Sequence, residues 1–240
     1  ISAIHVPAEG WLLAPAFLLV TAAAVTKAGS LPFHTWLPAA SEGAPAAVMA
    51  FLPAAVDKLL GIFLLVRLCT GIFVPGPVLG MTLMAVGAVT IVAAVLVAMV
   101  QHDLMRLLSY HAVSQVGYMV LAIGTLSPVG IAGGLFHMLN NALYKSCLFL
   151  CGGSVALKAG TTDLDELGGL AGAMPATFGA FLVAALASSG VPPLNGFVSK
   201  WMIYQGTIAA GGWAPMVFLV AAMFGSALTL ASFVKALYAV

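Results

Sequence analysis

The sequence predicts an all-α protein, a polytopic membrane helical bundle with inverted repeats and two broken helices. Of its 240 residues, 62% are apolar and only 6% are charged, whereas a soluble globular chain carries about 25% charged residues. So few charges cannot cover the surface of a water-soluble domain. Because about 20 apolar residues cross a bilayer core about 30 Å thick, the chain accommodates roughly seven or eight crossings. Two apolar stretches interrupted by glycine and proline indicate the broken helices.

Turn residues and the few charges divide the chain into segments of spanning length. The fourth segment opens with Asp103, which suits the positive end of a helix dipole. The fifth ends at the longest polar stretch, residues 158–169, which we expect to be a loop. In chain order, we expect helices at residues 11–28, 44–68, 76–100, 103–125, 128–157, 174–207 and 213–239.

The first and sixth segments are the expected broken helices. The first, taken over residues 11–38, contains the run 27–32 before a short piece that ends at Pro38. The sixth, residues 174–207, contains the run 188–193. Glycine and proline in both runs interrupt the helical hydrogen-bond ladder.

Interrupted segments five helices apart are typical of transporters built from inverted repeats, whose broken helices line an ion path near the membrane midplane. Two ordinary proline kinks are the alternative. On the first interpretation, residues 1–68 are the end of one repeat, with the broken helix 11–38 and the helix 44–68. Residues 76–240 are then a second repeat, with the broken helix 174–207.

Ionisable residues inside the expected helices are the candidate functional residues. A charge within a membrane span costs at least about 2.5–3.5 kcal/mol, so such residues usually face a bundle interior or a wet cavity. The candidates are Lys27, Asp57, Lys58, His137, Lys145, Lys200 and Lys235.

His137, Asn141 and Lys145 form the clearest pattern, because a spacing of four places all three on one face of a helix. The resulting polar stripe is about 12 Å long. Histidine titrates near neutral pH and a buried lysine can release its proton, so the stripe could relay protons through bound water. The alternative is a polar seam that holds helices together.

The remaining candidates have competing interpretations. Lys27 and Lys200 stand at the two helix breaks, where freed backbone groups can order water, although Lys200 could instead extend toward the membrane interface. Asp57 and Lys58 diverge by about 100° on a helix and need not pair with each other. Lys58 could belong to the path, or Asp57 could neutralise a neighbouring lysine, whereas Lys235 is expected at the interface.

Several classes of function are disfavoured. The net charge is +1, which suggests no nucleic-acid partner. The three cysteines have no metal-ligand spacing, and the phosphate-loop, dinucleotide and zinc-protease motifs are absent. We therefore expect no metal or cofactor in this chain. The first residues lack a signal-peptide pattern and an initiator methionine, so we expect a piece of a longer chain.

Four motifs, at residues 26–38, 106–119, 136–150 and 190–200, resemble the proton-translocating membrane subunits of respiratory complex I. The same family includes subunits of Mrp-type sodium/proton antiporters and of energy-converting membrane hydrogenases. Its usual core has fourteen helices, and the resemblance implies that this chain covers the seventh through the thirteenth.

The resemblance also implies roles for individual residues. Lys27 matches the lysine at the seventh-helix break, which in the family pairs with a glutamate that this chain does not contain. His137 and Lys145 match the histidine and the central lysine of the eleventh helix. Lys200 matches the lysine or glutamate at the twelfth-helix break, near the proton exit.

The sequence departs from the family pattern at four positions. Lys58 stands about one residue from the usual lysine of the eighth helix, and Pro53 stands where a histidine is frequent. Asn141 occupies a position that is sometimes histidine, so the central relay would depend on water. His111 stands where serine is common.

From these features we expect proton translocation by an antiporter-like subunit of a complex I-type NADH:quinone oxidoreductase or a related membrane hydrogenase. Redox cofactors would then belong to partner subunits of a multisubunit complex in a bacterial or archaeal cell membrane. A sodium/proton antiporter subunit and a non-conducting structural subunit are the alternatives. The expected proton path comprises Lys27, His137, Lys145 and Lys200, with Lys58, Asn141 and Asp57 as further candidates.

Overall fold

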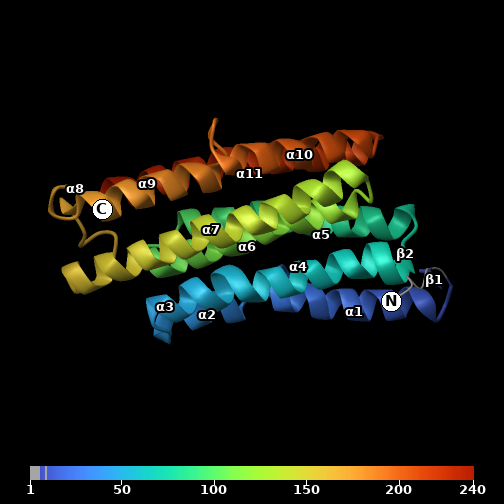
Figure 1. The fold of residues 1–240 in the computed structure, drawn as a ribbon, viewed down its shortest axis with the longest axis horizontal. Helices are drawn as coiled ribbons and strands as arrows, with labels where there is room; N and C mark the ends of the chain where they lie inside the picture. Colours follow the sequence, from blue (N-terminus) through green and yellow to red (C-terminus); the bar gives the residue numbers. More distant parts are fainter. Residues whose placement is uncertain (1–5, 9) are drawn as a thin grey trace.

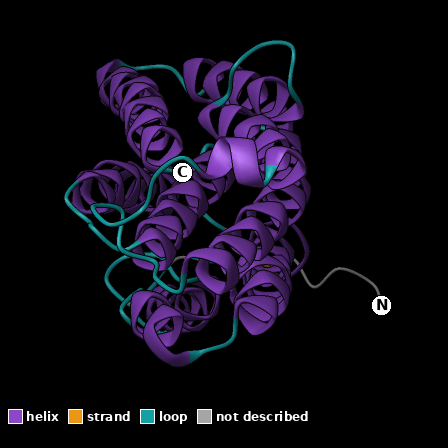
Figure 2. Ribbon diagram, turned by 90° about the vertical axis from the view of Figure 1, so that its left-hand side faces the viewer, coloured by secondary structure: helices purple, strands orange, loops and turns teal. Residues whose placement is uncertain are grey.

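The computed structural model describes residues 6–8 and 10–240 and confirms the all-α membrane bundle with two broken helices. The helices run side by side along one axis (Figure 1), and the view turned by 90° shows them nearly end-on (Figure 2). The elements are β1 (Val6–Pro7), α1 (Leu13–Ala28), α2 (Trp36–Gly43), α3 (Ala46–Phe51), the π-helical turn η1 (Leu52–Val56), α4 (Asp57–Arg67), the π-helical turn η2 (Leu68–Ile72), β2 (Phe73–Val74), α5 (Pro77–Met99), α6 (Leu104–Gly124), α7 (Pro128–Ala159), α8 (Leu170–Ala173), α9 (Pro175–Ser189), α10 (Asn195–Ala209) and α11 (Trp213–Ala239).

All of the expected helical segments are helical, with ends that differ by a few residues. By length and composition, four helical stretches of the described residues are able to cross a membrane, namely Ala46–Ile72, α5, α6 and α11. α1 and α9 are shorter apolar helices, because each ends at a break. α7 has 32 residues, which is long enough to span a bilayer, although it carries the polar stripe. The division into two inverted repeats stays a prediction, and part of the stretch without a signal-peptide pattern lies outside the described residues.

α6 lies at the centre of the bundle. All its residues except Arg106 and Tyr110 are buried. Its closest neighbour is α5, because small residues let the two backbones approach: a Cβ added to Gly87 would lie 2.5 Å from the backbone nitrogen of Leu121. Such small-residue contacts are the usual means of tight helix packing in a membrane. Side chains on α6 are therefore shielded from the surroundings of the bundle.

The two breaks lie at opposite edges of the bundle, where α1 and α2 on one side and α9 and α10 on the other lie end to end (Figure 1). Gly29, at φ 83°, ends α1, and Gly190, at φ 88°, ends α9. Glycine adopts this left-handed conformation without a steric penalty, which makes it the common terminator of helices. The N–H groups of both glycines donate to carbonyls of the last helical turn.

The predicted end of the first broken helix, at Pro38, is wrong. That half begins at Trp36 and continues to Gly43, whereas the sequence interpretation ended it at Pro38. The reason is that the first N–H groups of a helix have no intrahelical partner, so a proline in the first turn loses no hydrogen bond. Pro38 therefore belongs to the start of α2.

The predicted helix 44–68 is one continuous stretch that contains two π-helical turns, η1 and η2. Pro53 lies in η1, and proline within a helix frees carbonyls of the preceding turn. Side chains of α7 satisfy two carbonyls here: the Ser146 hydroxyl donates to Ala50 O at 2.7 Å, and the Asn141 amide donates to Ala54 O at 3.3 Å. α7 thus stabilises the irregular turn that precedes Lys58.

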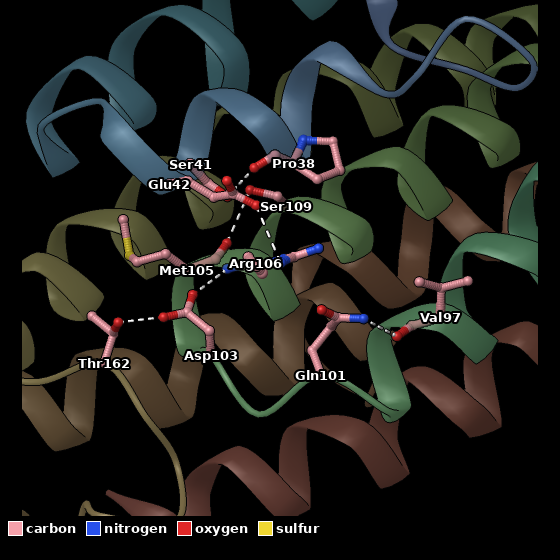
Figure 3. A network of polar contacts seen from close by, with 10 residues as sticks. All are labelled: Pro38, Ser41, Glu42, Val97, Gln101, Asp103, Met105, Arg106, Ser109 and Thr162. Carbon is pink, nitrogen blue, oxygen red and sulfur yellow. Dashed lines mark hydrogen bonds and ion pairs between the residues drawn. The ribbon is translucent and has the colours of Figure 1, made fainter.

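A polar network holds the N-terminal end of α6 (Figure 3). Asp103 caps the helix by accepting a hydrogen bond from the backbone N–H of Arg106 at 2.8 Å. The second carboxylate oxygen of Asp103 accepts a hydrogen bond from the hydroxyl of Thr162, in the loop after α7. The guanidinium of Arg106 pairs with Glu42 of α2 at 3.1 Å. These contacts connect α2, α6 and the loop at one end of the bundle.

Candidate functional site

Three lysines are buried at the centre of the bundle. Lys58 on α4, Lys145 on α7 and Lys200 on α10 expose 1%, 0% and 2% of their surface. None of them forms an ion pair: within the described ranges, 6–8 and 10–240, the only salt bridges join Lys27 to Asp57, His102 to Asp165 and Arg106 to Glu42. A buried charge without a counter-charge is costly, so these positions require an explanation.

Lys58 lies against the irregular turn η1. Its ammonium donates to the carbonyl of Pro53 at 2.6 Å. That carbonyl is accessible because the π-helical turn departs from the regular hydrogen-bond ladder, and such turns are frequent at functional sites. The turn thus supplies the one hydrogen-bond acceptor that the Lys58 ammonium has among the described residues.

Lys145 lies at the centre of the group. Its ammonium has no hydrogen-bond partner in the part of the chain that the structure describes. The ring of Phe233, on α11, lies 5.2 Å from the ammonium nitrogen, within the range of a cation–π contact. The charges of Lys58 and Lys200 both act on Lys145.

A hydrogen-bonded cluster surrounds His137 on α7. His137 Nδ1 bonds to the Ser199 hydroxyl at 2.9 Å, and His137 Nε2 bonds to Gln115 Oε1 at 3.1 Å. The hydroxyl of Tyr144 lies 3.4 Å from both Gln115 Oε1 and His137 Nε2. The cluster therefore joins α6, α7 and α10 through Gln115, His137, Tyr144 and Ser199.

Lys200 lies at the second helix break. Its ammonium donates to Ser189 O, in the last turn of α9, at 3.1 Å. A positive charge is favourable at this negative end of a helix dipole. The ammonium also lies 4.5 Å from the ring centroid of Tyr118, which in turn lies 5.7 Å from the His137 ring. Lys200 therefore contacts the half-helix end and the histidine cluster together.

Lys27 and Asp57 form an ion pair at the edge of the group. Lys27 Nζ lies 2.6 Å from Asp57 Oδ1, and the two side chains expose 53% and 15% of their surface. Asp57 begins α4 and directly precedes the buried Lys58. The pair thus lies beside the first lysine of the buried series and is more accessible than any of the three.

The structure brings together most of the residues singled out in the sequence. Lys58, His137, Asn141, Lys145 and Lys200 are all buried in the interior of the bundle. Asn141 contacts neither His137 nor Lys145 by a hydrogen bond, because its amide nitrogen donates to η1 instead and its oxygen has no partner among the described residues.

Sequence reasoning missed several polar residues around His137, namely Gln115, Tyr118, Tyr144 and Ser199. Gln115, on the fully enclosed face of α6, is the most informative, because a glutamine inside an apolar span is a recognisable polar exception. Tyr118 and Tyr144 carry no such signal, since tyrosine is common in helices of many kinds.

The described residues contain no group of three histidine, cysteine or acidic side chains able to hold a metal ion. The three cysteines are free thiols, and all lie in helical segments. The chemistry that this arrangement supports is proton exchange among lysine, histidine and hydroxyl groups.

Comparison with known proteins agrees with this arrangement. A family described as NADH:quinone oxidoreductase/Mrp antiporter, TM matches residues 1–229. The chain belongs to this family. Membership confirms the resemblance seen in the four sequence motifs, and the apolar helices show a multi-pass protein of the cell membrane.

Individual members of the NADH:quinone oxidoreductase/Mrp antiporter family are similar over most of this chain. Hydrogenase-4 component B of Escherichia coli is 36% identical over 208 residues, 81% of this chain and 31% of the relative. NADH-quinone oxidoreductase subunit N of Desulforudis audaxviator is 36% identical over 223 residues, 92% of this chain and 44% of the relative. The chain therefore spans less than half of the length of these family members.

A solved member of the family has the same fold. In the structure of the Mrp complex from Dietzia sp. DQ12-45-1b, one chain aligns with a TM-score of 0.90 and 30% identity, over 96% of this chain and 42% of that one. All three similar proteins are components or subunits of assemblies by their names.

Proposed function

We propose that this chain forms part of an antiporter-like membrane subunit that conducts protons through Lys58, Lys145, His137 and Lys200, with the Lys27–Asp57 pair at its edge. The observation that carries the proposal is the burial of three lysines without carboxylate partners. A structural seam is adequately built from neutral Asn, Ser and Thr, and three unpaired lysines would only destabilise it. A proton path, in contrast, requires groups that take up and release protons.

The contacts suggest how a proton moves along the series. Lys145 transfers a proton through bound water toward His137, since buried polar groups without a protein partner are positions that water commonly satisfies. His137 is held between Gln115 and Ser199 and passes the proton on to Lys200. Lys200 then releases it at the break between α9 and α10.

The Lys27–Asp57 pair supplies a means of control. When Lys27 moves away from Asp57, the carboxylate is left to interact with the adjacent Lys58. That change alters the proton affinity of Lys58 and, through the charge of Lys58, that of Lys145. A conformational change elsewhere in the assembly would thereby drive proton movement by electrostatics alone.

Protons fit this site better than sodium ions. The titratable groups of the buried series are lysine and histidine, whereas a hard cation such as Na⁺ binds to oxygen ligands, above all carboxylates. A row of ammonium groups would repel Na⁺. A sodium/proton antiporter subunit remains the second candidate, because the Mrp complex has a chain of the same fold.

The partners in this proposal are the other membrane subunits of a respiratory, hydrogenase or antiporter complex, together with the lipid bilayer. Redox cofactors belong to those partner subunits. In a respiratory or hydrogenase complex the assembly performs oxidoreduction, and this chain contributes the coupled transport.

The test replaces Lys145 in the complete protein, assembled in its complex in inverted membrane vesicles. NADH, formate, hydrogen and reduced ferredoxin are supplied in turn, and acidification is normalised to assembled complex. We expect Lys145→Ala to lower proton transport by about 100-fold, the lower range of what a positioned proton-transferring group contributes. Lys145→Arg should fail equally, because arginine keeps its proton under all relevant conditions.

Lys158→Ala, in the last turn of the same helix but exposed, is the matched control and should transport normally. Wild-type transport by Lys145→Ala would reject the proton path. Loss of assembly in both Lys145 variants, with normal transport in the complex that does form, would instead identify a structural subunit. Acidification that requires Na⁺ in the wild type would favour the antiporter.

A further inference from the structure

His111 on α6 is a buried titratable group that the proposed path does not use. It is fully buried, and its Nε2 bonds to the hydroxyl of Ser232 on α11 at 2.8 Å. Its Nδ1 is also buried and has no hydrogen-bond partner among the described residues. One ring nitrogen is therefore fixed toward α11, and the other is available inside the bundle.

The ring of Phe233 contacts both His111 and the central lysine. The rings of His111 and Phe233 are stacked, with centroids 4.5 Å apart and planes inclined by 18°. The same Phe233 ring lies 5.2 Å from the ammonium of Lys145. His111 and Lys145 thus share one aromatic neighbour and are not hydrogen-bonded to each other in this structure.

Among the described residues, the charged groups that act most strongly on His111 are both positive. These are Lys145 on α7 and Lys200 on α10. From α11 the packed side chains are Ser232 and Phe233, and the nearest ring beyond them is that of Phe181 on α9. Within residues 6–8 and 10–240, no carboxylate pairs with the imidazole, so its protonation responds to the protonation of the two lysines.

From Ser232, α11 continues toward the end of the bundle. Lys235 lies three residues later on α11, hence on the same helix face as Ser232. Its ammonium donates to the carbonyls of Met99 and Gln101, at 3.3 and 2.8 Å, where α5 ends. Lys235 is partly exposed and the neighbouring His102 is exposed. Ser232 and Lys235 therefore lie on one face of α11, between His111 and the end of the bundle.

We infer that His111 carries protons between Lys145 and this end of the bundle, through Ser232 and Lys235, as a side branch of the path. The inference rests on the proposed function of Lys145. In the transfer, the Lys145 ammonium loses a proton, through water, to Nδ1 of neutral His111. Nε2 then gives its own proton to the Ser232 oxygen, while the hydroxyl proton of Ser232 moves through water to Lys235, whose ammonium has first released a proton at the end of the bundle. His111 takes up one proton and gives up one, and Lys145 becomes a neutral amine.

The test compares His111→Gln and Ser232→Ala in the complete protein, in the vesicles described above. Glutamine retains a group that hydrogen-bonds to Ser232 but does not exchange protons near neutral pH. We expect each variant to lower proton transport per assembled complex about twofold, because the route through His137 and Lys200 remains open. The double variant should transport no worse than either single one, because residues of one relay act as a unit.

The control is Thr229→Val, which removes a fully buried hydroxyl of α11 that bonds only to its own helix, at Gly225 O. It should transport normally. Ser232→Ala is the smaller change, because it leaves the imidazole in place. The side branch is overturned if Ser232→Ala and any assembled His111→Gln complex both transport protons at the wild-type rate. If Lys145→Ala still abolishes transport in that case, the proposed function stands without the branch. If Lys145→Ala also transports normally, the proposed function itself has failed.

Discussion

Asp57 lies between two lysines of different kinds. Lys27, its partner at 2.6 Å, is about half exposed, whereas Lys58, the next residue in the chain, is buried. The Asp57 carboxylate balances the charge of Lys27. Among the described residues, the ammonium of Lys58 donates a hydrogen bond only to the Pro53 carbonyl. An acidic residue in this position is the means by which a movement of Lys27 would reach the buried series.

Asp57→Asn tests this position. The asparagine is similar in size but balances neither lysine, so we expect proton transport to fall roughly tenfold, the effect of an ordinary coupling free energy between two sites. The measurement is acidification per assembled complex. Asp165→Asn, which alters an exposed pair with His102, should leave transport unchanged because surface pairs contribute little. Equal transport by both variants would show that Asp57 has no part in control.

The sequence predicted the candidate residues better than their contacts. Lys58, Lys145 and Lys200 were identified because a lysine inside an apolar span is chemically conspicuous. Their partners were not identifiable in that way. The hydrogen bond from Lys58 to Pro53 and the contact of Lys145 with Phe233 depend on the backbone path of η1 and on the packing of α11.

At the scale of the helix, both breaks use the same arrangement of donors. The indole N–H of Trp36, on α2, donates to Thr26 O of α1 at 3.0 Å. The ammonium of Lys200, on α10, donates to Ser189 O of α9 at 3.1 Å. In each case the second half-helix supplies a side-chain donor to a carbonyl in the last turn of the first half. Lys200, which we propose as part of the proton path, is therefore also a helix cap.

Close packing of α1 and α4 holds the Lys27–Asp57 pair together. A Cβ added to Gly61 would lie 2.6 Å from the backbone nitrogen of Ala28 and 2.7 Å from the carbonyl oxygen of Ala24. Backbone atoms cannot rotate away as a flexible side chain can. The two helices would have to separate, and Lys27 directly precedes Ala28.

Gly61→Ala should accordingly destabilise the folded protein by about 1–3 kcal/mol and lower proton transport as Asp57→Asn does. The measurements are the thermal unfolding midpoint of the complete protein in detergent and acidification in vesicles. Gly179→Ala, inside α9 with open space at the added carbon, is the matched control and should affect neither. An unchanged unfolding midpoint in Gly61→Ala would contradict the tight contact.

For the molecule as a whole, burial differs greatly among the spans. In its most apolar window, 94% of the residues of α6 are buried, compared with 28% for α11. α6 is thus enclosed by this chain alone, whereas most of α11 lies on the outside of the bundle that this chain forms. Only one face of α11, which carries Ser232 and Phe233, contributes to the interior.

Phe224, near the middle of α11 and 52% exposed, tests this orientation. We expect Phe224→Arg to reduce the amount of protein assembled in the membrane fraction, since arginine at a helix centre costs about 2.5–3.5 kcal/mol. Phe224→Leu, which stays apolar, should assemble normally. Normal membrane levels of the arginine variant would show that this position faces water.

The sequence alone determined the class of the protein and the residues that are chemically exceptional in it. Apolar segments of fixed length imply membrane helices because the bilayer thickness sets that length, and glycine and proline imply breaks because they interrupt the backbone ladder. The tertiary structure decided which exceptional residues meet. Asp57 pairs with Lys27, Asn141 supports η1 instead of the polar stripe, and His111 and Lys145 contact the same ring of Phe233, because contacts between helices depend on packing that no single segment encodes.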